Sequence, residues 1–351
     1  MSPALCSIFL FSLGLGTMIV FTNSHWFLAW IGLEINTLAI IPIMVQLHQH
    51  HPRAVEAANK YFFTQIAGAA MLLIAATVNA WNTGQWAISQ PCSQSMASLT
   101  VLALGLKLGL APLHLWMPEV LQGVSFKTGL IISTWQKIAP LILILQMEFN
   151  APHLLIIMGV LSIIIGGLGA LNHNHLRKIL AYSSTAHLGW MIIVMQFSKS
   201  LTLLALVTYI IMTSGAFLLF DSMKAKSINT IMMYLPTNPS FFIVTFAILM
   251  SLSGFPPLTG FITKWIILDE LIKQQLLALA MVAALSALLS AFFYFRLAYV
   301  MALTLPPNTT YTQTSWRATS LSNLAMPLAV TTSLTMTLLP LMPALAALMS
   351  I

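Results

Sequence analysis

The stretch SLSGFPPLTGFITKW, residues 251–265, lies within a long apolar run and yet contains two adjacent prolines and a lysine. Apolar residues continue on both sides of it, from about residue 241 to residue 270, which is long enough for a membrane-spanning helix. Pro256 and Pro257 remove backbone donors, and Lys264 places an ammonium group at membrane depth. Both features are unfavourable in lipid, so the stretch predicts a membrane helix that is broken for a functional reason.

The composition of the whole chain agrees with a membrane protein. Of its 351 residues, 59% are hydrophobic and 6% are charged, and the mean hydropathy is +0.91. The apolar runs are continuous and lack the alternating pattern of barrel strands. We therefore predict an all-α, polytopic helical bundle that forms a single integral membrane domain over residues 1–351. The eleven predicted spans cover residues 3–21, 26–46, 60–81, 96–117, 124–146, 152–171, 175–197, 200–222, 241–270, 276–303 and 325–347.

Positive charges are distributed unevenly between the two sets of predicted loops. The formal net charge is +7, but the basic residues are scattered singly, so nucleic acid is not an expected partner. If the spans alternate in direction, one side receives only Lys199 and Lys273. The other side receives Arg53, Lys60, Lys127, Arg177, Lys178, Lys224, Lys226 and Arg317. By the positive-inside rule, this asymmetry predicts an N-terminus on the inner side and a C-terminus on the outer side.

Few features outside the spans suggest chemistry. The first residues, 1–14, have no basic flank before their apolar run, so we expect a retained first helix. With only Cys6 and Cys92, the sequence has no cysteine cluster for an iron–sulfur or zinc centre. The histidines of HQHHPR, residues 48–53, could bind a metal, but a solvated loop is favoured because no carboxylate or cysteine stands beside them. Residues 305–323 are polar and predict a surface loop.

Ionisable residues deep within the predicted spans are the most informative positions. They are Glu34, Lys107, Lys137, Lys264, His187 and His114. A charge at membrane depth costs a few kcal/mol, so it is usually paired or lies beside water. Desolvation or a nearby cation can make a lysine release its proton, whereas the charge of arginine is practically permanent. The set therefore predicts a polar route for protons, and the alternative is a group of static ion pairs that only fixes helix packing.

A second broken helix is predicted around Lys107. In LALGLKLGLAPLHLWMPEV, residues 102–120, Gly105, Gly109 and Pro112 interrupt an apolar run. This pattern of a glycine-to-proline break followed by an aromatic-rich half-helix is shared with residues 251–265. Two such breaks in corresponding halves of a bundle point to inverted structural repeats with an ion site at each break, although two unrelated kinks remain the alternative.

Four of these positions have open interpretations. Glu34 has Asn36 as a near polar neighbour, and it could switch its protonation state when a cationic partner moves. Lys137 lies between the two breaks in chain order and could bridge them, or its flexible stem could reach the membrane interface. His187 follows the hydroxyl residues 183–185, which could order water or simply allow close helix packing. His114 could pass a proton, hydrogen-bond free carbonyls, or be structural.

These residues carry a family resemblance. The motifs are LGLKLGLAPLHLWMPEVLQG at 104–123, HNHLRKILAYSSTAHLGW at 173–190, SLSGFPPLTGFITKW at 251–265 and the early Glu34. Together they resemble the antiporter-like subunits of respiratory complex I in its animal mitochondrial form, over nearly the whole chain. The resemblance implies a proton-translocating module in the inner mitochondrial membrane, with its N-terminus on the matrix side and its C-terminus on the intermembrane-space side. Its implied partners are the other antiporter-like and small hydrophobic membrane-arm subunits, and membrane lipids.

The resemblance also implies roles for individual residues. Glu34 resembles the glutamate that pairs with the lysine of the first broken helix, here Lys107. Lys137 resembles the bridging lysine, Lys264 the terminal lysine of the second broken helix, and His187 a histidine of the same family. No cofactor or metal is implied in this chain, since NADH, FMN, iron–sulfur clusters and ubiquinone are expected in other subunits. A stand-alone cation/proton antiporter and a purely structural membrane subunit remain the alternative functions.

Overall fold

The computed structural model describes residues 3–46, 51–90, 93–147, 152–234, 239–303 and 325–349. Within these ranges the chain is helical, with two isolated β-bridges and no strand, which confirms the predicted all-α class. The helices are α1 (Pro3–Thr22), α2 (Trp26–Gln46), α3 (Pro52–Thr83), α4 (Gln94–Leu108), α5 (Trp116–Gly123), α6 (Phe126–Ser133), α7 (Trp135–Gln146), α8 (Pro152–Gly169), α9 (Leu176–Met195), α10 (Lys199–Ser222), α11 (Ile228–Tyr234), α12 (Pro239–Ser253), α13 (Thr259–Lys273), α14 (Leu277–Leu303) and α15 (Ala325–Met349). His48, His50, Cys92 and the predicted loop at 305–323 lie outside the described residues.

Each of the eleven predicted spans coincides with one helix or with two consecutive helices. In the described ranges, seven helical stretches are long and apolar enough to cross a membrane, with α6 and α7 counted as one stretch. The first halves of the two broken helices, α4 and α12, are apolar but shorter. The structure differs from the prediction in that α3 begins at Pro52 rather than at residue 60, the short helix α11 was not predicted, and α5 continues past residue 117 to Gly123. The chain is therefore a polytopic helical membrane protein.

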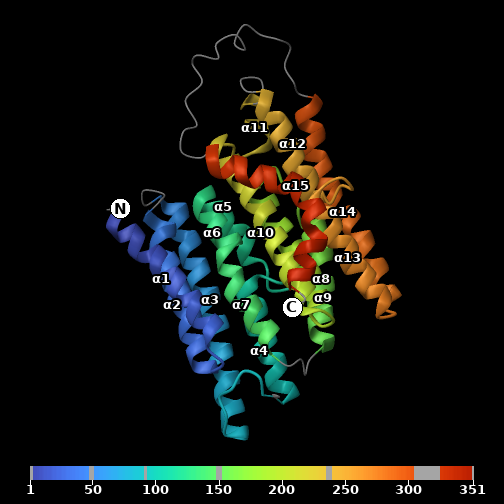
Figure 1. The fold of residues 1–351 in the computed structure, drawn as a ribbon. Helices are drawn as coiled ribbons and strands as arrows, with labels where there is room; N and C mark the ends of the chain where they lie inside the picture. Colours follow the sequence, from blue (N-terminus) through green and yellow to red (C-terminus); the bar gives the residue numbers. More distant parts are fainter. Residues whose placement is uncertain are drawn as a thin grey trace. The chain divides into compact units, whose positions relative to one another are not determined.

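The described chain divides into two compact units, Met1–Ser162 and Ile163–Ile351. In the first unit, α1 packs on α2, α2 on α3, and α3 on α4 and α5 (Figure 1). In the second unit, α10 packs on α9, α12 and α15, and α14 packs on α12 and α13. The single functional domain over residues 1–351 and the inverted repeats stay predictions.

The two predicted helix breaks are present, and each begins at a glycine with a left-handed backbone. Gly109, with φ 77°, ends α4, and its N–H donates to the carbonyl of Gly105. Gly254, with φ 81°, follows the last residue of α12, and its N–H donates to the carbonyl of Ser251. Glycine adopts this conformation with little strain, so it ends each first half-helix cleanly before the prolines that follow.

A third interruption lies at Thr134, between α6 and α7, where no break was predicted. Thr134 has φ −110° and ψ −68°, and its hydroxyl donates to the carbonyl of Leu130 at 2.7 Å. Threonine hydroxyls that bond back to the preceding turn often bend helices. The bend places Lys137 in the first turn of α7.

The second break is compact because α13 starts against the backbone of α12. A Cβ added at Gly260 would lie 1.8 Å from the carbonyl oxygen of Ser251, so only glycine fits at this crossing. Lys264 follows one turn later on α13. The crossing therefore fixes the position of Lys264 relative to the end of α12.

We expect Gly260→Ala to destabilise the protein, because the backbone of Ser251 cannot yield as a flexible side chain could. Overpacked buried sites commonly cost about 1–3 kcal/mol, and a collision with backbone belongs at the upper end of that range. The midpoint of thermal unfolding of the purified assembly measures the effect. Gly14→Ala is the matched control, since an added Cβ there meets nothing within 4 Å. Equal midpoints for the two variants would contradict this account.

Candidate functional site

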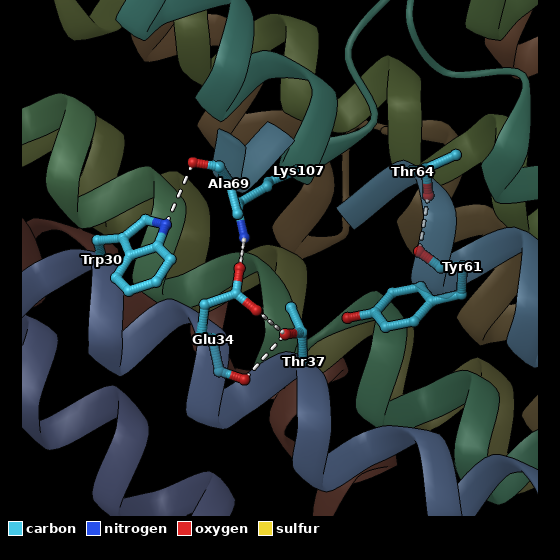
Figure 2. Close-up of polar contacts among 7 residues, drawn as sticks. All are labelled: Trp30, Glu34, Thr37, Tyr61, Thr64, Ala69 and Lys107. Atoms are coloured by element: carbon cyan, nitrogen blue, oxygen red, sulfur yellow. Dashed lines mark hydrogen bonds and ion pairs between the residues drawn. The ribbon is translucent and has the colours of Figure 1, made fainter. Parts of the chain in front are cut away.

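The structure brings Glu34 and Lys107 together as a buried ion pair. Lys107 Nζ lies 3.8 Å from Glu34 Oε1, with the lysine side chain 2% exposed and that of the glutamate 21% exposed (Figure 2). Neither of these two atoms makes a hydrogen bond to another described residue. At this distance the two charges attract each other without the constraint of a hydrogen bond, so the pair is held loosely.

Local packing explains why Lys107 points at α2. A Cβ at Gly68 of α3 would come within 3.1 Å of Lys107 Cγ, so glycine leaves room for the lysine stem. On the next residue of α3, the carbonyl of Ala69 accepts a hydrogen bond from the indole of Trp30 at 3.2 Å (Figure 2). This bond ties α2 to α3 one turn before Glu34. The contacts of α3 with α2 and with the Lys107 stem therefore position the two side chains opposite each other.

Thr37 is a partner of Glu34 that the sequence analysis missed. Its hydroxyl lies 2.8 Å from the backbone oxygen of Glu34 and 3.1 Å from Oε2. The available signal was the three-residue spacing, which puts both side chains on one face of α2. Asn36, the neighbour noted from sequence, faces Gly16 of α1 instead, where an added Cβ would collide with the Asn36 side-chain oxygen.

The first break supplies its own hydrogen-bond donors. The indole of Trp116, the first residue of α5, donates to the carbonyl of Leu106 at 3.0 Å, across the break. His114 lies inside the break, 4% exposed, and interacts with the backbone of Pro112. Trp116 therefore provides a donor for a carbonyl next to Lys107, and His114 contacts the backbone of the break at Pro112.

Lys137 is buried within the first unit. Its side chain is 2% exposed, which argues against the alternative that it extends to the membrane interface. The adjacent Gln136 donates to the backbone oxygen of Asn36 at 3.2 Å, which links the start of α7 to the turn of α2 that carries Glu34.

In the second unit, Lys264 closes the end of the preceding half-helix. Its Nζ donates to the carbonyl of Ser253, the last residue of α12, at 2.9 Å. A Cβ at Gly254 would come within 3.2 Å of Lys264 Nζ, so the glycine makes room for this bond. A cation at a helix C-terminus is favoured by the helix dipole and by the unpaired carbonyls there.

His187 and Lys264 line the same small cavity, together with Ser183 and Tyr294. The centre of a water-sized sphere can move within about 10 Å³ of this cavity, which is close to the minimum volume for one water molecule. The Ser183 hydroxyl donates to its own helix at Leu180, as expected for a packing role. A larger cavity of about 350 Å³, lined mainly by apolar side chains, also reaches Lys264.

The sequence-predicted site residues thus form two groups. Glu34, Lys107, Lys137 and His114 belong to the first unit, and His187 and Lys264 belong to the second. Transfer between the two groups stays a prediction. Within the described ranges, no three His, Cys, Asp or Glu side chains gather as a metal site.

The two broken membrane helices, with Lys107 in the last turn of α4 and the ammonium of Lys264 bonded to the last residue of α12, are the features that point to the class of antiporter-like membrane proteins. Residues 23–290 match the family described as "NADH:quinone oxidoreductase/Mrp antiporter, TM", and residues 291–346 match "NADH dehydrogenase subunit 2 C-terminus". The chain belongs to the NADH-ubiquinone oxidoreductase chain 2 family, as its relatives show. The predicted family is therefore confirmed.

Relatives named NADH-ubiquinone oxidoreductase chain 2 are similar over their full length. The chain is 54% identical to that of Carassius auratus, over 98% of this chain and 99% of the relative. It is 55% identical to that of Formosania lacustris, over 99% of each chain. Two solved structures share the fold. A chain of respiratory complex I from Thermus thermophilus has a TM-score of 0.85 at 24% identity, covering 99% of this chain and 81% of that one. A chain of the Mrp complex from Dietzia sp. DQ12-45-1b has a TM-score of 0.80 at 17% identity, covering 95% and 74%.

We expect Gly254→Ala to destabilise the protein more than Gly84→Ala does. Both glycines have a positive φ, so both substitutions carry the backbone strain, but an added Cβ at Gly84 meets nothing within 4 Å. Only the change at Gly254 presses on the ammonium that bonds Ser253. A hydrogen bond from a charged donor contributes about 1.5–3 kcal/mol, so we expect an extra loss of about 1 kcal/mol. Thermal unfolding of the two variants measures this difference, and identical losses would mean that the lysine contact adds nothing.

Proposed function

We propose that this chain is a membrane-arm subunit of NADH:ubiquinone oxidoreductase that translocates protons across the inner mitochondrial membrane. The proposed relay consists of Glu34, Lys107, Lys137 and Lys264, assisted by His187 and His114. The observation that carries the proposal is the buried Glu34–Lys107 pair beside the first helix break. Such a pair joins a group that can hold a proton to one that can release it.

The proposed mechanism is electrostatic. At an effective dielectric constant near 20, two unit charges about 4 Å apart interact by about 4 kcal/mol. An energy of this size changes a protonation equilibrium by roughly three orders of magnitude. Separating Lys107 from Glu34, or neutralising the carboxylate, therefore removes most of what keeps the lysine charged in an apolar site. Its proton would pass toward Lys137, and the Lys264 and His187 group would accept or release it in turn.

The loose geometry of the pair supports this use over a purely static one. A pair at 3.8 Å without a hydrogen bond is held by the Coulomb attraction alone, whereas a structural pair also gains from close, well-formed hydrogen bonds. The stand-alone antiporter is the weaker alternative. The family matched by residues 23–290 includes both oxidoreductase and antiporter chains, while the full-length relatives at 54% and 55% carry the oxidoreductase name.

We also propose an orientation in the membrane and partners for the chain. We place the N-terminus on the matrix side, because the basic loops of the predicted topology gather on that side. The chain would work as one membrane module beside the other membrane-arm subunits and lipids, and it would bind no NADH, FMN, iron–sulfur cluster or ubiquinone itself. Electron transfer elsewhere in the complex would trigger the change at Glu34.

Glu34→Gln and Lys264→Met are each expected to leave assembly largely intact and to depress NADH-driven proton pumping. Loss of one acid–base step commonly lowers a rate by about 10²–10⁴, and we expect at least a tenfold drop here. Proton uptake by liposomes containing the intact complex measures pumping, and a native gel stained for NADH dehydrogenase activity measures assembly. Lys199→Met, at the exposed start of α10, is the control and should pump normally. Normal pumping in both test variants would favour a structural subunit.

A further inference from the structure

The two oxygens of Glu34 have different neighbours from different helices. Oε1 faces Lys107 on α4, and Oε2 accepts from the hydroxyl of Thr37, which belongs to α2 like Glu34 itself. A movement of α4 therefore changes one contact and leaves the other unaltered.

Thr37 stands out among the buried threonines of the first unit. Thr17 and Thr100 also donate to a carbonyl three residues back, at 2.8 Å each, as helical threonines often do. Thr37 makes the same bond to the backbone of Glu34 and in addition has a carboxylate oxygen at 3.1 Å. Its single hydroxyl proton can thus turn from the carbonyl to the carboxylate by a small rotation.

Tyr61 of α3 lies next to Thr37 (Figure 2). It is fully buried, its hydroxyl points toward Thr37, and it is near enough to Glu34 for the two groups to interact electrostatically (Figure 2). Its ring packs edge-on against Trp116, with ring centroids 5.7 Å apart. Since Trp116 spans the first break, Tyr61 connects that break to the surroundings of the carboxylate.

We propose that Thr37, supported by Tyr61, is a positioning residue that holds one oxygen of Glu34 so that the other faces Lys107. This inference rests on the proposed proton relay and adds a residue to it. The carboxylate torsion of glutamate is soft and roughly two-fold, so the ion pair alone does not fix it. A donor on the same helix fixes it and stays in place when α4 moves.

The hydrogen bond from Thr37 to Glu34 also stabilises the carboxylate when the ion pair opens. When Lys107 leaves, a buried carboxylate without a donor would be strongly destabilised. The Thr37 hydroxyl then turns fully to Oε2 and stabilises the separated state. It lowers the cost of opening the pair, which is the step on which the relay depends.

Thr37→Val tests the proposal, because valine has nearly the same shape and lacks the hydroxyl. In the intact complex reconstituted in liposomes, we expect about a tenfold loss of NADH-driven proton pumping, since bonds to charged groups are among the stronger hydrogen bonds. Thr37→Ser keeps the hydroxyl and should restore most of the rate. Thr100→Val, at a threonine of α4 that is 1% exposed, is the matched control and should pump normally.

A spectroscopic readout separates positioning from packing. The infrared band of the Glu34 carboxyl group is identified by its loss in Glu34→Gln. We expect Thr37→Val to shift this band, Tyr61→Phe to shift it less, and Thr37→Ser to return it toward its original frequency.

The outcomes are distinguishable. Normal pumping and an unshifted band in Thr37→Val would overturn the inference, as would a serine variant that behaves like valine. Failure of Thr37→Val to assemble would also overturn it, because the hydroxyl would then be needed for folding. If Glu34→Gln and Lys264→Met both pump normally, the proposed function fails, while a shifted band in Thr37→Val would still show that Thr37 holds the carboxylate.

Discussion

A membrane helix can be interrupted only where the freed backbone groups find partners inside the protein, and this constraint organises both units of the chain. At the first break, the N–H of Gly109 donates to the carbonyl of Gly105, and the indole of Trp116 donates to the carbonyl of Leu106. At the second, Gly254 bonds back to Ser251 and Lys264 takes the carbonyl of Ser253. Each interruption is thus satisfied locally, which makes an unwound segment tolerable at membrane depth.

The constraint also explains why lysines occupy different positions in the two breaks. In sequence the two breaks share a glycine-to-proline pattern, but Lys107 precedes its break and Lys264 follows its break. In the structure both belong to the end of a first half-helix, since Lys107 lies in the last turn of α4 and the ammonium of Lys264 bonds the last residue of α12. The carbonyl end of a half-helix favours a cation, so each break creates its own site for an ammonium group.

The parts of the fold that depend on local chemistry could be predicted from sequence. Glycine and proline mark the two breaks because their backbone properties act over a few residues. The interruption at Thr134 was missed because threonine gives no comparable sequence signal: Thr17 and Thr100 also bond back to the preceding turn, and their helices continue. The partner of Lys264 could not be predicted, because its bond to Ser253 requires the close crossing at Gly260, a feature of the tertiary fold.

In the candidate site as well, the residue types could be predicted from the sequence, and their geometry could not. The pairing of Glu34 with Lys107 was implied by the family resemblance, whereas the charges alone indicated only that each group in lipid needs a partner or water. Their separation of 3.8 Å could not be predicted, since it results from the stem of Lys107 passing Gly68 and from Trp30 holding α2 to α3. In the proposed relay this separation matters, because closer contact would add hydrogen bonds and hold both charges in place, and a wider gap would leave each charge too costly to bury. An ion pair that takes part in proton transfer has to be stable enough to form and weak enough to open, and we propose that the packing of α2, α3 and α4 sets this balance.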